Sequence, residues 1–388
     1  MTALFGFDDV ATHANMILDK ARVTAFAQAI AEVVRPGDVV ADLGTGTGLL
    51  AVLAAQAGAR RVFAVERGPV AELALEVARD NGVENVVEVM KSDVRDVCFP
   101  EPPDVLVSET LGSFGVDEGV LGLAKTAAAR CRPGCRIVPS ALKVELALAD
   151  LREHRTELAE LESGYSVRLG ALARRVRARP SMAHTVVTDL LCVPSTAVSL
   201  VVGTDALPSR MATSLYAARS GSANAIVGFF QARLSPTVEL ASGPGPSSPS
   251  WAHVVFPLAP DLPLEEGDRI DVEVRPRLVT DRGTWAWSAQ RVRPGCANDI
   301  RRGDAMRSLV GGKTELMAQL GLRSLRDVAA TTANSSILAA WAAAFGGSVE
   351  PVDAMAERLR RAQPERYADD TDARQAVLEL LRAAKEPF

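Results

Sequence analysis

Residues 39–48 read Val-Val-Ala-Asp-Leu-Gly-Thr-Gly-Thr-Gly, and they decide the fold class. A short apolar run, typical of a buried strand, ends in Asp42 and a loop with glycine at alternate positions. Residues 49–55 are apolar and predict a helix. This order brings bare backbone to the carboxyl end of a parallel strand, beside a helix N-terminus, where a cofactor can bind. The spacing Gly-x-Gly-x-Gly also differs from the dinucleotide spacing Gly-x-Gly-x-x-Gly.

A second acid favours cofactor binding over a glycine-rich turn that binds nothing. The strand-like run 61–65 ends at Glu66, about 20 residues after the glycine loop. In related strand–helix–strand units an acid at this separation binds ribose hydroxyls. We therefore expect residues 39–66 to form a nucleoside-containing cofactor site.

Length and composition exclude several classes of protein. A chain of 388 residues can hold two or three domains, and it has no apolar run of roughly 18 residues that would predict a membrane span. The first residues lack the features of a secretory signal. The net charge of −5 disfavours nucleic-acid binding and suits a cationic substrate.

The cysteine pattern predicts free thiols in a cytoplasmic protein, with neither a disulfide framework nor a metal site. The five cysteines form no Cys-x-x-Cys pair; they are Cys98, Cys131, Cys135, Cys192 and Cys296. Ala, Arg and Val are abundant and Lys is scarce, which is typical of bacterial genes of high GC content.

The chain predicts three regions. In residues 1–148 short apolar strands alternate with helices, which predicts an α/β domain with a parallel sheet. Residues 149–293 contain an amphipathic helix over 158–172 and then Val/Thr-rich segments, which predict an antiparallel β domain. Residues 294–388 are rich in Ala, Leu and Arg and predict a helical extension. The strands expected in the first region are 38–43, 61–66, 86–90, 104–108, 135–138 and 142–148.

Two glutamates follow the fourth strand of the predicted parallel sheet. Glu109 and Glu118 lie nine residues apart on one loop, which opens at the same edge as the glycine loop. Two carboxylates at a cofactor pocket are costly unless they bind a cation. Guanidinium pairs with carboxylates in a bidentate manner and is the natural guest, although solvated loop charges remain the alternative.

These motifs together resemble protein arginine methyltransferases, which are class I S-adenosylmethionine-dependent enzymes. The resemblance covers residues 4–293 and rests on motifs that occur in the family's order. They are His13-x-x-Met16-x-x-Asp19-x-x-Arg22, Asp42-x-Gly44-x-Gly46-x-Gly48, Val65-Glu66, Ser108-Glu109 with Gly112, Glu118 and Leu121, Ala225-Ile226-Val227-x-Phe229-Phe230, and Trp251-x-x-x-Val255-Phe256.

The resemblance implies a Rossmann-like domain followed by a β-barrel, S-adenosylmethionine as the cofactor and no metal. It implies that Arg22 binds the cofactor carboxylate and that Glu109 and Glu118 are catalytic. It also implies a homodimer formed through an arm at about residues 151–175. The expected cofactor-binding residues are Phe7, His13, Met16, Arg22, Asp42, Gly44, Gly46, Gly48, Glu66, Asp93, Val94 and Glu109, and the expected substrate pocket contains Ser250 and Trp251.

The chain departs from the family pattern at the pocket. Ser250 replaces a histidine before Trp251, Thr110 replaces an aromatic residue after Glu109, and Arg95 replaces a carboxylate of the adenine segment. A reshaped pocket favours free arginine or another guanidino metabolite of bacterial biosynthesis, as in arginine N-methyltransferases of the streptozotocin-pathway type. His253, on the same predicted strand, is a candidate substitute for the missing histidine.

Three alternatives remain open from the sequence. The acceptor is arginine in a protein or peptide, the chain is an inactive binding protein derived from the family, or it methylates an unrelated hydroxyl or carboxyl group. The intact glycine loop and both glutamates disfavour the second alternative. The carboxylate pair disfavours the third, because it repels an acidic acceptor.

Overall fold

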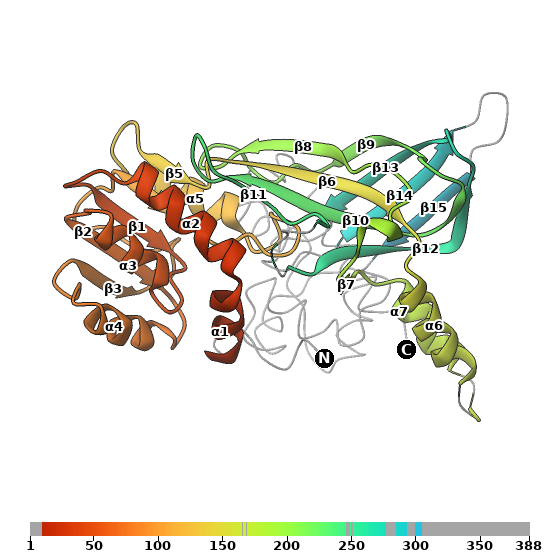
Figure 1. Cartoon of the computed structure of the whole chain (residues 1–388), viewed down its shortest axis with the longest axis horizontal. Coiled ribbons are helices and arrows are strands. Elements are labelled where there is room, and N and C mark those ends of the chain that lie inside the picture. The colour runs from red at the N-terminus through yellow and green to blue at the C-terminus, as the bar shows by residue number, and fades with distance from the viewer. Residues whose placement is uncertain are drawn as a thin grey trace, which may run out of the picture.

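The computed structural model describes residues 10–164, 166–167, 169–245, 249, 251–276, 285–292 and 299–304. These residues form one parallel sheet flanked by helices and two antiparallel sheets (Figure 1). The predicted fold, a Rossmann-like domain followed by an antiparallel β domain, is confirmed. Beyond residue 304, the predicted helical extension lies outside the described residues.

The parallel sheet places a crevice where the glycine loop begins. Its strand order is β3-β2-β1-β4-β5, formed by β3 (Val87–Lys91), β2 (Arg61–Glu66), β1 (Val39–Leu43), β4 (Val105–Val107) and β5 (Arg136–Val138). All five residues of β1 are buried, as expected of a central strand covered on both faces. The chain order reverses between β1 and β4, and ligands bind at the carboxyl ends of strands at such a switch point.

Helices cover both faces of this sheet: α2 (Lys20–Val33), α3 (Leu49–Gln56), α4 (Ala71–Asp80) and α5 (Val120–Ala128) pack on its strands, and α1 (Val10–Leu18) contacts α2. Helix α2 buries Phe26 and Ile30, and Asp19 caps it by accepting the Arg22 N–H at 3.2 Å. None of the helices among the described residues has the length and apolar character needed to span a bilayer.

The antiparallel part consists of two sheets that pack against each other. One has the order β7-β12-β10-β6-β8 with β11 beside β10, and the other has the order β15-β14-β13-β9. Aromatic side chains fill the space between them, with Phe114 in contact with Phe256 and Trp285. The strands are β6 (Ala141–Ala149), β7 (Ser181–Ala183), β8 (Ser195–Val201), β9 (Met211–Tyr216), β10 (Gly221–Arg233), β11 (Glu239–Ala241), β12 (His253–Leu264), β13 (Arg269–Pro276), β14 (Trp285–Val292) and β15 (Asp299–Asp304).

The two antiparallel sheets also meet along their edges, which gives the barrel-like form. At one edge the hydroxyls of Ser195 in β8 and Thr213 in β9 lie 2.9 Å apart. At the other edge Arg301 in β15 donates to the carbonyl oxygen of Pro260 in β12 at 2.7 Å.

Two expected boundaries are corrected by the sheets. Strand β6 was expected in the parallel domain, but it pairs antiparallel with β10 and β8. Its sequence explains this, because Leu142, Val144 and Leu146 are buried and alternate with the more exposed Lys143 and Glu145. Such alternation is typical of antiparallel strands, whereas parallel strands are apolar throughout. The second sheet also continues past residue 293, since β15 pairs with β14.

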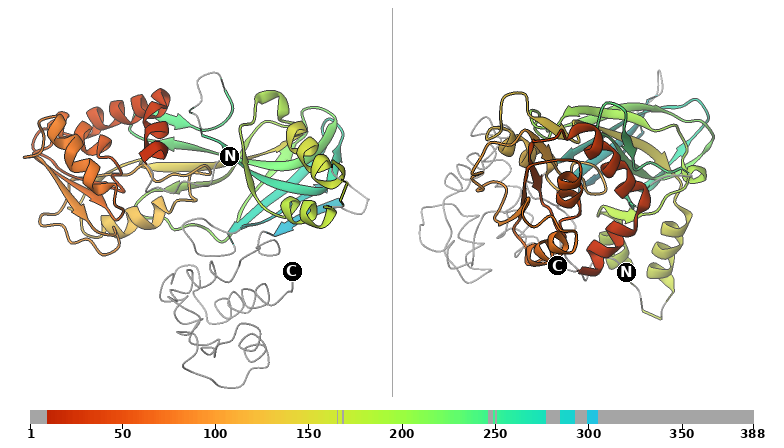
Figure 2. Two further views of the ribbon diagram at one scale, coloured as in Figure 1. Left: turned by 90° about the horizontal axis from the view of Figure 1, so that it is seen from below. Right: turned by 60° about the vertical axis from the view of Figure 1, so that its left-hand side comes forward.

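The expected single helix over 158–172 is two helices, α6 (Arg152–Ser163) and α7 (Gly170–Arg177). Helix α6 ends at Gly164, whose N–H donates to the Glu160 carbonyl at 2.7 Å. Arg177 and Glu162 then join the two helices through an ion pair of 3.1 Å. We call α6 and α7 the arm; it projects from the end of the molecule opposite α4 (Figures 1 and 2).

Candidate active site

A cavity of about 260 Å³ opens at the carboxyl edge of the parallel sheet, close to the lower end of the range for small-molecule sites. It brings together ten of the residues expected to bind the cofactor or act in catalysis. They are His13, Met16, Arg22, Gly44, Gly46, Glu66, Asp93, Val94, Glu109 and Glu118. Phe7 and Ser250 lie outside the described residues.

The glycine loop forms one wall of this cavity through backbone alone. Gly44 and Gly46 have φ of 73° and 54°, and both line the cavity. A Cβ on Gly46 would lie 2.7 Å from Cε1 of His13, so the buried imidazole of α1 packs directly on the loop. Gly48 has a different role from the one expected, since it does not line the cavity. A Cβ there would lie 3.1 Å from the Cβ of Ala74 in α4, so Gly48 permits helix packing.

Asp42 also does not line the cavity; it lies beneath the glycine loop and binds it through Thr45. Its carboxylate is 1% exposed, and Oδ2 accepts the Thr45 hydroxyl at 2.5 Å. Burial raises the pKa of Asp42 to about 7. The hydroxyl of Thr45 and the backbone N–H of Ala51 in α3 oppose this rise.

Glu66 joins the end of β2 to the glycine loop and lines the cavity. Its carboxylate accepts the N–H of Gly46 at 3.1 Å and that of Gly68 at 2.7 Å. Each oxygen has a second lone pair free to accept a further donor. This is the arrangement needed to bind a pair of hydroxyls, so the residues present suit a cofactor that carries a ribose.

The segment expected to contact adenine is organised by arginines. Arg95 binds Asp93 through two parallel bonds of 2.8 and 2.7 Å, and this pairing lowers the pKa of Asp93 to about 2. Arg130 holds the same segment from behind, donating to the carbonyl oxygen of Val94 at 3.0 Å and to that of Arg95 at 2.6 Å. Arg95 therefore binds Asp93 at the position where the family pattern has a carboxylate.

Arg22 occupies the centre of the site between Glu109 and Trp251. Its Nη1 lies 3.4 Å from Oε2 of Glu109, and its Cζ lies 3.6 Å above the indole ring of Trp251. Burial raises the pKa of Glu109 to about 6, and the charge of Arg22 opposes this rise. Trp251 thus contacts the site through Arg22 rather than by lining the cavity.

Asp117 is a residue that the sequence reasoning missed. Its carboxylate accepts the N–H of Phe114 at 2.8 Å and that of Ser113 at 3.3 Å, which fixes the loop between the two glutamates. Burial raises the pKa of Asp117 to about 6. The available signal was an acid directly before Glu118 in a loop that turns at Gly112.

The loop that carries the two glutamates packs tightly against strand β10 of the antiparallel sheet. Phe114 packs where Gly228 of β10 has no side chain. Reciprocally, Phe230 of β10 packs on Gly115, where a Cβ would lie 2.6 Å from its Cβ. These two contacts fix the position of the loop, and therefore of both glutamates, relative to β10.

His253 does not line the cavity and does not replace the missing histidine there. Its Nδ1 lies 2.6 Å from the Thr185 hydroxyl, and its Nε2 lies 2.6 Å from the carbonyl oxygen of Ser242. The buried ring therefore braces the start of the segment that leads to Trp251.

Residues 24–144 match the family model described as Ribosomal protein L11 methyltransferase (PrmA). The protein arginine N-methyltransferase PRMT10 of Oryza sativa subsp. japonica is 30% identical over 299 residues, which are 66% of this chain and 78% of the relative. The chain belongs to the protein arginine methyltransferase family. It is an S-adenosylmethionine-dependent arginine methyltransferase, as the motifs predicted.

Two solved structures of this family share the fold. The Trypanosoma brucei PRMT1 enzyme–prozyme heterotetrameric complex with AdoHcy has a TM-score of 0.70 and 22% identity, over 77% of this chain and 99% of that chain. The protein arginine methyltransferase 10 of Arabidopsis thaliana has a TM-score of 0.67 and 21% identity, over the same shares.

Proposed function

We propose that this arginine methyltransferase binds the acceptor guanidinium between Glu109 and Glu118 and methylates one of its nitrogens. The observation that carries the proposal is that both carboxylates line the cavity built by the glycine loop. In addition, Glu109 already lies beside a guanidinium, that of Arg22, so this part of the cavity suits the group chemically.

The cofactor residues follow from the same wall of the cavity. In our assignment Glu66 binds the ribose hydroxyls, Arg22 binds the cofactor carboxylate, and the backbone of Gly44 and Gly46 allows close approach. Val94 and the paired Asp93 border the adenine. Bound S-adenosylmethionine supplies an activated methyl group on its sulfonium.

The two glutamates orient the acceptor and manage its charge. A guanidinium has a pKa above 12, so neither carboxylate deprotonates it in advance. Instead Glu109 and Glu118 draw positive charge onto the nitrogens that they contact, which makes the remaining nitrogen a better nucleophile. A carboxylate oxygen of Glu118 then accepts the proton that the methylated nitrogen loses.

For the acceptor itself we propose free L-arginine or another small guanidino compound. Thr110 in place of an aromatic residue and the Arg95–Asp93 pair give this cavity a lining that differs from the family pattern, and the composition fits bacterial biosynthesis. Arginine in a polypeptide is the second candidate, because the relatives are named protein arginine N-methyltransferases.

The glutamate assignment predicts the effect of neutral variants. We expect Glu109→Gln and Glu118→Gln each to lower kcat by about 100-fold or more, because the charge that stabilises the transition state is lost. The Kd for S-adenosylmethionine should change little in Glu118→Gln, whereas Glu109 also contacts Arg22 of the cofactor site. Glu84→Gln, an exposed surface change, is the matched control. Wild-type turnover in both glutamine variants would refute the guanidinium clamp.

The acceptor proposal predicts the outcome of a substrate panel. With labelled S-adenosylmethionine, free L-arginine should be methylated with a kcat/KM at least equal to that of an arginine-glycine-rich peptide. L-arginine amide should be a poorer substrate, because a small-molecule site must bind the α-carboxylate in a desolvated pocket. Turnover of the peptide without turnover of free arginine would establish the second candidate.

A further inference from the structure

Cys131 and Cys135 form a thiol pair behind the cofactor site, in the turn between α5 and β5. The sequence of this turn is Cys-Arg-Pro-Gly-Cys, and it closes through the Cys135 N–H, which bonds to the Arg132 carbonyl oxygen at 3.1 Å. Gly134, with φ of 79°, reverses the chain, so that both cysteines pack against the same apolar cluster of the parallel domain; the Cys131 thiol donates to the carbonyl oxygen of Ala127 at 3.2 Å. Both cysteines are half-buried and free, so a small reagent can reach them.

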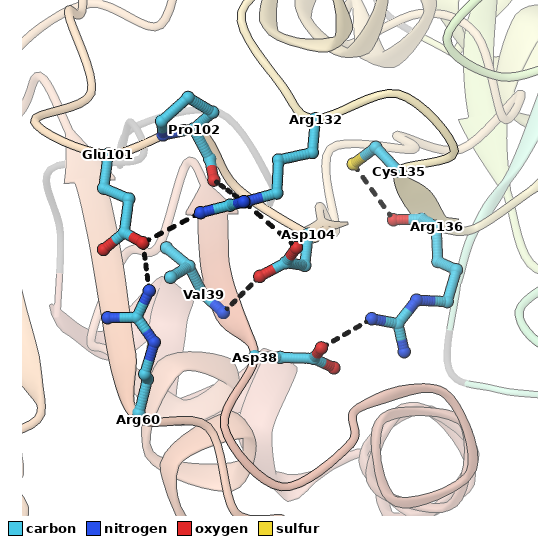
Figure 3. A network of polar contacts seen from close by, with 9 residues as sticks. All are labelled: Asp38, Val39, Arg60, Glu101, Pro102, Asp104, Arg132, Cys135 and Arg136. Atoms are coloured by element: carbon cyan, nitrogen blue, oxygen red, sulfur yellow. Dashed lines mark hydrogen bonds and ion pairs between the residues drawn. The ribbon is translucent and has the colours of Figure 1, made fainter.

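The surroundings of the pair differ between the two sulfurs. Cys135 Sγ is 3.6 Å from the carbonyl oxygen of Arg136, within a network that also contains Arg132, Asp104 and Asp38 (Figure 3). The neighbouring Cys131 thiol and the Arg136 guanidinium lower the pKa of Cys135, although burial opposes this. The neighbouring Cys135 and burial raise the pKa of Cys131. Cys135 is therefore the thiol of the pair that ionises more readily.

A direct contact connects this turn to the cofactor cavity. Arg130, the neighbour of Cys131, binds the carbonyl oxygens of Val94 and Arg95. Val94 and Arg95 line the cavity. A change in the shape of the turn would therefore move the guanidinium that holds this part of the cavity wall.

We propose that Cys131 and Cys135 are a reversible redox site whose bridging weakens cofactor binding. The oxidant class is a low-molecular-weight disulfide. The Cys135 thiolate attacks one of its sulfurs, which forms a mixed disulfide and releases one thiolate. The Cys131 thiol then loses its proton and attacks the Cys135 sulfur, which forms the protein disulfide and releases the second thiolate; the two released thiolates take up the two protons that the cysteines lose. The two cysteines are oxidised, the small disulfide is reduced to two thiols, and excess dithiol reverses the reaction.

The covalent step is tested by peptide mass mapping of the full chain after treatment with oxidised glutathione. A Cys98→Ser/Cys296→Ser background removes an exposed thiol and one outside the described residues, and retains the pair and the buried Cys192. Trypsin cuts after Arg130 and Arg136 but not between Arg132 and Pro133, so one peptide, 131–136, carries both sulfurs. It should be lighter by two hydrogen atoms.

A matched variant separates the two thiols. Cys131→Ser in the same background should accumulate a glutathione adduct on Cys135, because the thiol that resolves it is absent. If the 131–136 peptide remains reduced, or if the two-thiol protein holds a stable adduct without bridging, the redox site is refuted.

The coupling is tested by calorimetry of S-adenosylmethionine binding. Bridging should raise the Kd by about 5-fold or more, the lower end of typical couplings between sites, and dithiothreitol should restore it. The Cys131→Ser/Cys135→Ser variant, treated with the same oxidant, should bind with unchanged Kd. If the bridged protein binds S-adenosylmethionine with the Kd of the reduced protein, the Arg130 contact does not couple the cysteine pair to the cofactor site, and the proposal is refuted.

Discussion

At the scale of residues, the half-buried carboxylate of Glu109 predicts a pH profile. Its pKa of about 6 means that it is protonated at lower pH and cannot hold a guanidinium. We expect kcat/KM for the acceptor, measured at saturating cofactor, to fall as the pH drops below about 6. Because Arg22 lowers this pKa, Arg22→Gln should move the fall to higher pH. If kcat/KM falls at the same pH in Arg22→Gln as in the wild type, a group other than Glu109 causes the fall.

Asp117 predicts a pH dependence of stability rather than of chemistry. Its pKa is raised from 3.8 to about 6, so the folded state favours the protonated form. Its contribution to the free energy of unfolding is complete below the unfolded pKa and is lost as the pH rises through about 6. Relative to Asp117→Asn, the wild type should lose on the order of 1–2 kcal/mol between pH 5 and pH 8 in denaturant titrations. A constant difference between the two proteins would contradict this.

Single residues also show where sequence reasoning about the site stops. Spacing alone located Gly44, Gly46, Glu66 and the two glutamates near one sheet edge, because parallel strands end together. It could not separate a glycine that faces a ligand from Gly48, which faces a helix. It also could not show that Asp42 is enclosed beneath the loop, since an acid at a strand end can point either way.

At the scale of elements, the contact between the catalytic loop and β10 predicts a coupled pair of substitutions. Gly228→Ala would place a methyl group against the ring of Phe114, and we expect a loss of about 1–3 kcal/mol of stability. Phe114→Leu should relieve part of that loss, so a double-mutant cycle should give a favourable coupling energy. Gly122→Ala on α5, which meets no atom within 4 Å, is the control and should stabilise slightly. Additive effects of the two changes would show that the contact is not tight.

The elements themselves were predicted where their pattern was unambiguous. The continuous apolar runs of β1 and β2 and the glycine loop between β1 and α3 predict only one arrangement, buried parallel strands with a turn at the sheet edge. The prediction for β6 is wrong because its place in the chain, directly after the alternating strands and helices, indicates the parallel sheet, whereas its alternating burial pattern indicates an antiparallel one. The arm was expected as one helix because its leucines keep helical spacing across Gly164. The helical hydrogen bonds of α6 stop there, with the bond from the Gly164 N–H to the Glu160 carbonyl oxygen as the last one.

At the scale of the whole molecule, the arm carries the prediction of assembly. We propose that the protein is a homodimer joined through the exposed apolar side chains of α7, Leu172 at 46% and Val176 at 37% exposure. Leu172→Glu/Val176→Glu should yield a monomer in light scattering with an unchanged far-UV circular dichroism spectrum. Leu75→Glu on α4, also exposed, should leave the dimer intact. A wild type that is monomeric at all concentrations would refute the proposal.

Leu158 of α6 is not a suitable position for that experiment. It has helical spacing like the other leucines, but it is 7% exposed and packs within its own chain. A charge at Leu158 would therefore unfold the arm instead of separating subunits. Sequence spacing identifies an apolar face, but only the packing shows which part of it is already covered.

The reciprocal contacts Phe114–Gly228 and Phe230–Gly115 also have an evolutionary consequence. A large residue in the loop is accommodated by the smallest residue in the strand, and the reverse holds one step along. A catalytic loop grafted from a relative would fit only if β10 were transferred with it. Mutational drift at these four positions is expected to be concerted, so loop and strand are inherited as one unit although more than a hundred residues separate them in the gene.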